Sequence, residues 1–563
     1  MNGHQPARNA LLASSGHSDL CLSYTAMTFD RFLGEFKGKL ELQTFLDRYG
    51  RWRPFVNLLG WITLFIALPA QGQGGGTHTT LEQVNQAVRD TQRLCEDQIE
   101  KGAVPGLAIA VVFQDQVVYS AGFGVRDVNT REPVNADTVF QLASLSKAIG
   151  STVVAELVGE GKISWDSRIN DLDPDFVMYD PWVTREITIR DFYAHRSGLP
   201  ANAGASLEIL GFNREQILHR LRYQKPNSSF RSHWAYTNFG VTEAAVAAGK
   251  AYNLTWEDAS EQKLYRPLGM NSTSSRYADF SAGTNKALGH VQVDGKWVQK
   301  YKRDPDPQSP AGGVSSSVND LAKWMRLQLA NGQFEGKRIV DENALAETHS
   351  PQIFMWFDPL NGLPLFYGLG WIVSYDKEGR LHLWHTGIFT TGAATIVQLV
   401  PSEQLGIVIL TNAFPPGVGE GLARTFSDVA LYGKATQDWV AYFKKMYSNP
   451  AALGVGTDYS KPPAAPGPAL ATSAYVGTYT NDLYGEIQII EQDDGLAMVE
   501  GPSKLTFPLK HYARDLFTCD NTEGETSGVG FTIGADGKAT TVVVEELNSQ
   551  GDGTFKRGSA EDR

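Results

Sequence analysis

The chain has 563 residues, of which 42% are hydrophobic and 20% charged, so it is long enough to form two or more globular domains. Its formal net charge of -12 and its pI near 5.5 argue against a nucleic-acid partner, because phosphate binding needs a basic surface. Its three cysteines lie far apart and match neither a metal-ligand nor a disulfide spacing, and no phosphate-binding glycine pattern is present. We therefore expect no cofactor, no metal and no structural disulfide.

The amino end carries an apolar run at residues 55–68, behind the basic flank Arg51-Trp52-Arg53 and before the small-residue site Ala70-Gln71-Gly72. A run of this length matches a secretory signal better than a spanning helix, which needs about 20 residues. Because about 50 residues precede the run, a long leader, a wrongly assigned start and an uncleaved anchor all stay open, as does a buried core helix. We expect residues 1–76 to be an extension that exports the protein to the periplasm or medium, or attaches it to a membrane.

Residues 80–101 have the spacing of an amphipathic helix, and residues 107–113 and 117–121 are typical of the two strands of a hairpin.

A Ser-x-x-Lys pattern at Ser144 and Lys147 lies in an apolar stretch, residues 140–158, with helical spacing. A serine in the first turn of such a helix lies near the positive end of its dipole, and a lysine three positions on shares its face. Burial would lower the pKa of the lysine, so that it sits neutral or shares a proton with the hydroxyl. The pattern recurs at Ser260 and Ser374, but acidic neighbours around Ser260 indicate a solvated helix face. The structural alternative for the first pair is a helix cap and a solvated lysine.

Tyr236 and Asn238 form a Tyr-x-Asn pattern, and side chains two residues apart point the same way from an extended chain. Tyr236 is a candidate general base toward Ser144 and acid toward the leaving group, if a cationic lysine lowers its pKa. Asn238 is a candidate partner of Lys147 and of a substrate amide. The alternative for the two residues is a buried aromatic and a turn residue.

The third pattern, His385-Thr386-Gly387, lies between strand-like runs at residues 381–384 and 394–400. A strand beside the nucleophile can supply one backbone N–H to an oxyanion, while the serine N–H supplies another. The alternative is a histidine that is satisfied by backbone and lines the site without acting.

Late strands are expected at residues 370–374, 381–385, 394–400 and 405–411, after a stretch to about residue 345 that is helical and loop-like. Early and late strands around intervening helices indicate an α/β (α+β) fold, with one mixed, mostly antiparallel sheet flanked by helices and a helical subdomain beside it. We place this domain at residues 77–445, with the cleft between sheet and subdomain.

Residues 446–470 contain a proline-rich, semi-rigid linker. Beyond it, residues 471–563 hold short alternating strands separated by turn residues, which predict a small antiparallel β-barrel or sandwich.

Taken together and in this order, the three patterns resemble the class C beta-lactamase and penicillin-binding serine hydrolase family. The stretches Ala311-Gly312-Gly313 and Gly368-Leu369-Gly370 resemble it too, and the likeness spans about residues 80 to 430. It implies Ser144 as acylated nucleophile, Lys147 and Tyr236 as its activating pair, Asn238 as a lysine and substrate partner, and His385, Thr386 and Gly387 as the strand that flanks the substrate. It also implies Ile388 as the second oxyanion N–H donor. The carboxy-terminal strands resemble the lipocalin-like domain that follows some of these hydrolases.

Two histidines need separate interpretation. Beta-lactamases of this kind carry lysine at the place of His385, so an anionic substrate would be held less firmly by an imidazole that is mostly neutral at pH 7. The His-Thr-Gly form resembles the esterase and peptidase branches, with weak acylation by beta-lactams expected at most. His195 is a tempting base, but its segment resembles a structural turn after a helix.

The sequence thus predicts a serine hydrolase that acts on a small ester, amide or peptide through an acyl-enzyme. The alternative is a penicillin-binding cell-wall sensor with the same fold and little turnover. Neither the substrate nor the oligomeric state follows from the sequence.

Overall fold

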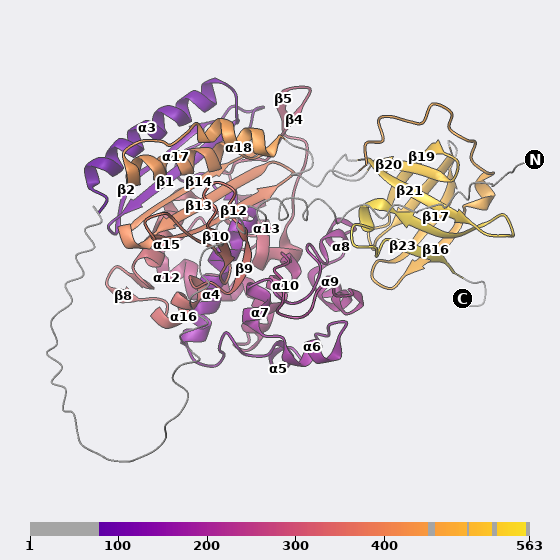
Figure 1. The fold of residues 1–563 in the computed structure, drawn as a ribbon, viewed down its shortest axis with the longest axis horizontal. Coiled ribbons are helices and arrows are strands. Elements are labelled where there is room, and N and C mark those ends of the chain that lie inside the picture. The colour runs from indigo at the N-terminus through magenta and orange to yellow at the C-terminus, as the bar shows by residue number, and fades with distance from the viewer. Residues whose placement is uncertain (1–77, 449–456, 493–494, 521–525, 559–563) are drawn as a thin grey trace, which may run out of the picture. The chain divides into compact units, whose positions relative to one another are not determined.

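The computed structural model describes residues 78–448, 457–492, 495–520 and 526–558 (Figure 1). The apolar run at residues 55–68 and Cys21 lie outside this part. Within it, no helix combines the length and the apolar character needed to cross a bilayer. Cys95 and Cys519 are buried free thiols.

The helices and strands of the described residues have the following bounds. The α-helices are α3 (Leu81–Glu100), α4 (Ser146–Gly159), α5 (Ile169–Leu172), α6 (Pro181–Glu186), α7 (Ile189–Tyr193), α8 (Ala205–Ile209), α9 (Arg214–Arg220), α10 (Asn238–Lys250), α11 (Trp256–Ser260), α12 (Arg266–Leu268), α13 (Tyr277–Ala282), α14 (Ser309–Gly312), α15 (Val318–Leu329), α16 (Glu342–Thr348), α17 (Val418–Tyr432) and α18 (Trp439–Tyr447). The strands are β1 (Gly106–Phe113), β2 (Gln116–Gly124), β3 (Phe140–Gln141), β4 (His290–Val293), β5 (Lys296–Val298), β6 (Ser315–Ser316), β7 (Gln333–Phe334), β8 (Lys337–Arg338), β9 (Ile353–Phe357), β10 (Pro364–Tyr367), β11 (Ile372–Tyr375), β12 (Leu381–Phe389), β13 (Ala393–Val400), β14 (Leu405–Thr411), β15 (Ala413–Phe414), β16 (Gly477–Asn481), β17 (Gly485–Gln492), β18 (Gly495–Glu500), β19 (Leu505–Ala513), β20 (Leu516–Asp520), β21 (Thr526–Ile533), β22 (Ala539–Val544) and β23 (Thr554–Arg557).

The main sheet has eight strands in the order β2-β1-β14-β13-β12-β11-β10-β9. Every neighbouring pair in it is antiparallel. The early hairpin therefore lies directly beside the late strands, with β1 paired to β14. This arrangement confirms the predicted fold class.

The two faces of the sheet are covered by different helices. Alternate residues of β1, Leu107, Ile109 and Val111, belong to an apolar cluster with buried residues of α3 and α17, and Figure 1 shows these two helices, indigo and orange, side by side. Ala108 and Ala110 point the other way, into a larger core that includes α4 and α15. The alternation follows from the period of two along a strand.

Helix α4 is buried on nearly all sides, as expected of a helix that is apolar all round and packed between α10, α14 and α16. The sequence predicted one helix over residues 140–158, and the structure divides this stretch. Phe140 and Gln141 form β3, a 3-10 turn covers Ala143–Leu145, and α4 begins only at Ser146. The candidate nucleophile therefore lies before the α-helix and not in its first turn.

The carboxy-terminal strands β16 to β23 form a closed antiparallel barrel, in which β23 pairs back onto β16. Its interior is filled by alternate apolar residues such as Tyr479, Ile487, Val542 and Phe555, each at most 1% exposed. The barrel confirms the predicted small β-domain, while its exact boundaries and the linker at 446–470 stay predictions.

Candidate active site

Ser144 lies in a turn whose backbone is held in an unusual conformation. Ala143, directly before it, has φ of 48°, a left-handed value that residues with a Cβ seldom adopt. Such a conformation costs about 1–3 kcal/mol and persists only where the surroundings impose it. The Leu142 carbonyl is fixed by the hydroxyl of Thr395 in β13, which donates to it at 2.7 Å. The turn thus presents the Ser144 hydroxyl from a constrained backbone.

Lys147, the second residue of α4, is fully buried, and three oxygen atoms lie close to its side-chain nitrogen. Its Nζ lies 3.1 Å from Ser144 Oγ, 2.6 Å from Asn238 Oδ1 and 2.9 Å from the Ala311 carbonyl oxygen. Burial lowers the pKa of Lys147 well below its ordinary value.

Counting protons on this lysine gives its role. A neutral amine has two N–H donors and one lone pair. The Asn238 amide oxygen and the Ala311 carbonyl can only accept, so they take the two N–H groups. In the neutral amine the lone pair is left for Ser144, whose hydroxyl can donate, whereas in the charged form Nζ donates to Ser144 Oγ. A neutral Lys147 therefore has a partner for each N–H group and for its lone pair, and the partner of the lone pair is the nucleophile hydroxyl.

Tyr236 lies against both residues of this pair. Lys147 Nζ is 4.4 Å from the centroid of the Tyr236 ring, and the Tyr236 hydroxyl hydrogen bonds with Ser144. Burial raises the pKa of Tyr236 far more than the bond to Ser144 lowers it. This overturns the expectation of a lowered tyrosine pKa. Because burial raises its pKa, Tyr236 is a protonated phenol suited to pass on a proton.

Tyr236 and Asn238 reach the site together because Thr237 between them is extended, with φ of -133° and ψ of 117°, and α10 begins at Asn238. The Thr237 N–H donates to Nδ1 of His195 at 3.1 Å. The His195 ring also packs on Tyr236, with centroids 4.4 Å apart.

His195 itself is fully buried, and burial lowers its pKa well below the usual value. Its Nε2 has no hydrogen-bond partner among the described residues. Because Nδ1 accepts from backbone, the proton is on Nε2, and the ring supports Tyr236 without reaching Ser144. This agrees with the predicted structural role.

His385 is enclosed, with 3% of its surface exposed, and both ring nitrogens are bonded to protein. Nδ1 lies 2.6 Å from the Thr386 carbonyl and therefore carries the proton, which leaves Nε2 to accept from the Tyr367 hydroxyl at 2.9 Å. Burial, and then the charge that Lys147 can carry, lower the pKa of His385 to about 3. In this geometry His385 has no free nitrogen for a substrate carboxylate, which argues against the anchor considered from the sequence.

Strand β12 runs directly along the nucleophile turn at Gly387. A Cβ added there would lie 2.0 Å from the Leu142 carbonyl oxygen and 2.9 Å from the Leu145 nitrogen. Residues 385–389 pair with β13 but extend past the end of β11, so one edge of this segment is open. Alternate N–H groups of an edge segment point away from the partner strand, so this segment can offer an N–H to the site, and the donor role of Ile388 stays a prediction.

Three features of the site escaped sequence reasoning. Ala311 acts through its backbone carbonyl, which no residue type reveals, although its Ala-Gly-Gly context was noticed. Tyr367 lies in an apolar run that gave no catalytic signal. Gly370, with φ of 82°, lets its loop approach the Lys147 carbonyl, where a Cβ would lie 2.5 Å away. The expectation that Ser260 is solvated is wrong, because its side chain is buried and donates to the Trp256 carbonyl.

Comparison with known proteins identifies the class. The Beta-lactamase family model matches residues 91–431, more than half of the chain, so the chain belongs to this family. A model described as a domain of unknown function matches residues 461–557, the barrel region.

Two relatives and one solved structure illustrate the range of similar proteins. Unguisins hydrolase ungD' of Aspergillus campestris is 26% identical over 72% of this chain and 78% of its own length. Penicillin-binding protein 4 of Amycolatopsis lactamdurans is 24% identical over 67% of this chain and 94% of its own. The octameric penicillin-binding protein homologue from Pyrococcus abyssi has a similar fold, with a TM-score of 0.52 and 20% identity over 81% of this chain and 98% of that chain.

Proposed function

We infer that the protein is a serine hydrolase that forms an acyl-enzyme on Ser144 and hydrolyses a small ester, amide or peptide. The observation that carries this inference is the set of contacts around Lys147: two are acceptors and the third is Ser144 Oγ at 3.1 Å, so a neutral amine can accept the Ser144 proton while it keeps the other two contacts. Membership of a family whose relatives include a named hydrolase supports it.

The chemistry follows from these contacts. Ser144 Oγ attacks the substrate carbonyl carbon while its proton moves to Lys147 Nζ. The N–H groups of Ser144 and Ile388 are the proposed donors to the oxyanion. As the intermediate collapses, the bond to the leaving group breaks, and the leaving group takes a proton through Tyr236, which the lysine reprotonates. Water then attacks the ester on Ser144 by the same route and releases the acid and the free hydroxyl.

Burial lowers the pKa of both His385 and Lys147, so neither of these residues is a permanent cation beside Ser144. A substrate carboxylate next to the scissile bond would gain little there. We therefore propose esterase or peptidase activity, with at most weak acylation by beta-lactams. Action outside the cytoplasm, and membrane attachment through the amino-terminal apolar run, remain proposals from the sequence.

The test is intact-mass analysis and steady-state turnover with p-nitrophenyl acetate. We expect an acetyl adduct that maps to Ser144 and many turnovers per molecule. Ser144→Ala should abolish both, whereas Ser260→Ala, which alters the buried serine of the second Ser-x-x-Lys pattern, should keep both. A stoichiometric burst without turnover would favour the penicillin-binding sensor instead, and adducts in Ser144→Ala would rule out Ser144 as nucleophile.

A further inference from the structure

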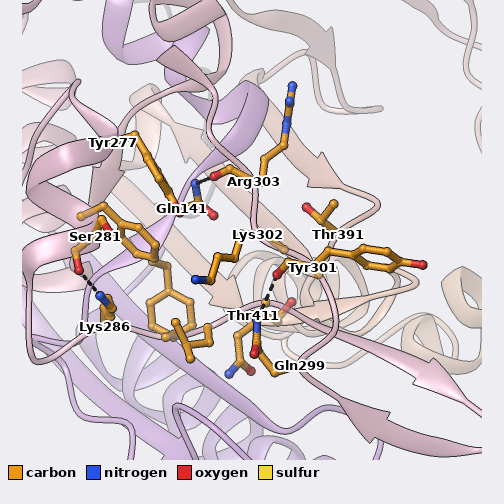
Figure 2. Close-up of a pocket in the computed structure, with 18 residues that line it drawn as sticks. Gln141, Tyr277, Ser281, Lys286, Gln299, Tyr301, Lys302, Arg303, Thr391 and Thr411 are labelled. Atoms are coloured by element: carbon orange, nitrogen blue, oxygen red, sulfur yellow. Dashed lines mark hydrogen bonds between the residues drawn. The ribbon is translucent and has the colours of Figure 1, made fainter. Parts of the chain in front are cut away.

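A pocket of about 360 Å³ lies where the segment after β5, helix α13 and the β12–β13 hairpin meet (Figure 2). Its volume is in the range of small-ligand sites. Helix α13 and its following loop contribute Tyr277, Phe280 and Lys286, and the hairpin contributes Thr391.

The pocket adjoins the nucleophile turn through β3. Gln141 lines it and donates from Nε2 to the Arg303 carbonyl at 2.9 Å. Gln141 is three residues before Ser144, so their Cα atoms are at most about 11 Å apart. The pocket therefore lies close to the nucleophile turn.

The charge of this pocket is opposite to that of the whole protein. Its lining includes three basic residues, Lys286, Lys302 and Arg303, and no aspartate or glutamate, although the chain has a net charge of -12. Arg303 is paired with Glu208 at 2.7 Å, and Lys286 donates to the Ser281 carbonyl. Lys302 has no hydrogen-bond or ion-pair partner within the part of the chain that the structure describes. Figure 2 shows its side chain reaching into the pocket, whereas Arg303 points out of it.

The remaining walls suit an apolar group that also carries an N–H. The rings of Phe140, Tyr277 and Phe280 supply apolar surface. Asn412 is 2% exposed, and its Nδ2 donates to two backbone carbonyls, but its Oδ1 has no partner among the described residues. A buried acceptor without a donor is costly unless a ligand satisfies it. A cation, apolar walls and a free acceptor together match a carboxylate, a side chain and an amide N–H.

We propose that this pocket binds the carboxylate-bearing end of the substrate, an aromatic or apolar amino-acid residue with a free carboxyl group, and that Lys302 selects for it. The proposal rests on the proposed acyl-enzyme chemistry at Ser144 and adds the substrate class. Because neither His385 nor Lys147 is a permanent cation beside Ser144, such selection would depend on Lys302.

The first experiment uses N-succinylphenylalanine and N-adipoylphenylalanine, each with a p-nitrophenyl ester on the succinyl or adipoyl carboxyl and a free carboxylate on phenylalanine. Each ester is compared with its counterpart in which phenylalaninamide replaces phenylalanine. For the linker, succinyl or adipoyl, that is long enough to place phenylalanine in the pocket, we expect kcat/KM for the carboxylate to exceed that for the amide by about tenfold. This ratio corresponds to the free energy of a hydrogen bond to a charged group. Lys302→Gln should reduce the preference to about twofold. The matched control is Lys300→Gln, which removes the same charge two residues away, where Lys300 lines a different pocket. A preference that survives in Lys302→Gln, or falls equally in Lys300→Gln, overturns the proposal.

A second measurement separates this proposal from the chemistry. Calorimetry of Ser144→Ala with N-acetylphenylalanine and N-acetylphenylalaninamide reports binding without turnover. We expect the acid to bind more tightly than the amide, and this difference to disappear in the Ser144→Ala, Lys302→Gln double variant. That result supports the pocket even if ester turnover proves independent of Ser144. Equal binding of acid and amide overturns the pocket, even if Ser144 proves to be the nucleophile.

Discussion

The protonation state of Lys147 determines whether the site can react, because only the neutral form of Lys147 can accept the Ser144 proton. Its buried position lowers its pKa, so activity should rise as the pH rises through that pKa. Asn238 Oδ1, at 2.6 Å, is its shortest contact. The state of Lys147 is therefore sensitive to the charge at position 238.

Asn238→Asp tests this dependence. A carboxylate beside Nζ favours the charged lysine and should raise the pKa of Lys147. The acid limb of the kcat/KM profile should then move to higher pH, with a loss of about tenfold or more at pH 7 that is partly recovered at alkaline pH. Asn238→Ala, which removes the contact without adding charge, should lower activity without moving the limb upward. An unmoved limb in the aspartate variant would show that Lys147 is not the group that titrates.

The contact between Tyr367 and His385 gives a second prediction. Tyr367→Phe removes the only hydroxyl that donates to Nε2 in the described structure and leaves a buried acceptor unpaired. We expect the free energy of unfolding to fall by about 1–2 kcal/mol in urea titration. Tyr375→Phe, at an exposed position, should change it little.

Because the pKa of His385 is about 3, its imidazole stays neutral from pH 5 to 8, so it should cause no change in carboxylate preference over that range.

The sequence predicted which residues meet at the site but not their protonation. Ser144, Lys147, Tyr236 and Asn238 carry residue types whose spacing is informative, and the structure brings them together. The direction of the Tyr236 pKa depends on how deeply the ring is buried, which spacing does not reveal. The bonds that occupy both nitrogens of His385 come from a distant tyrosine and from backbone, and neither leaves a local sequence signal.

At the scale of elements, the site depends on how closely β12 approaches the nucleophile turn. Gly387 has no side chain to keep the strand from the Leu142 carbonyl, and Thr395 of the neighbouring strand ties that carbonyl down. The strand and the turn are thus held together from two sides.

Gly387→Ala should therefore damage catalysis more than folding. The added methyl would lie 2.0 Å from backbone oxygen, so strand or turn must shift. A displacement of about 1 Å at a reacting group can cost about 100-fold, and we expect kcat/KM for p-nitrophenyl acetate to fall at least that much. Gly419→Ala in α17 is the control, since its methyl would meet other methyl carbons at 3.7 Å. Wild-type kinetics in Gly387→Ala would contradict the close packing.

The predicted elements were most accurate where the apolar pattern is long. The hairpin at β1 and β2 and the strands β13 and β14 match the expected ranges within a few residues. Two differences have physical causes. The apolar stretch at residues 140–158 is not one helix because Ala143 adopts a left-handed backbone, which tertiary contacts impose. Strand β12 continues to Phe389 because pairing with β13 extends it through the His-Thr-Gly pattern.

At the scale of the whole molecule, the chain joins an antiparallel sheet with helices on both faces to a closed barrel. Alternating strands predicted the barrel class, because each short strand must bury one face. Closure could not be predicted this way, since it depends on pairing between β16 and β23, the first and last strands. Arg557 reinforces that closure. Its guanidinium lies 4.9 Å from the Tyr479 ring centroid and donates to the Val476 carbonyl at 2.8 Å and to the Tyr479 hydroxyl at 2.7 Å.

We predict that residues 457–558, expressed alone, fold cooperatively, because about 100 residues with a closed ring of strands can bury a core of their own. Circular dichroism during urea unfolding should show one sigmoidal transition. Arg557→Ala should lower the free energy of unfolding of this fragment by about 2 kcal/mol, since it removes several hydrogen bonds at the seam between β16 and β23. Lys510→Ala is the control, because its pair with Asp520 is exposed and worth at most about 1 kcal/mol. A fragment that unfolds gradually from zero denaturant would show that the barrel depends on the rest of the chain, and equal effects of the two variants would show that Arg557 does not hold the seam.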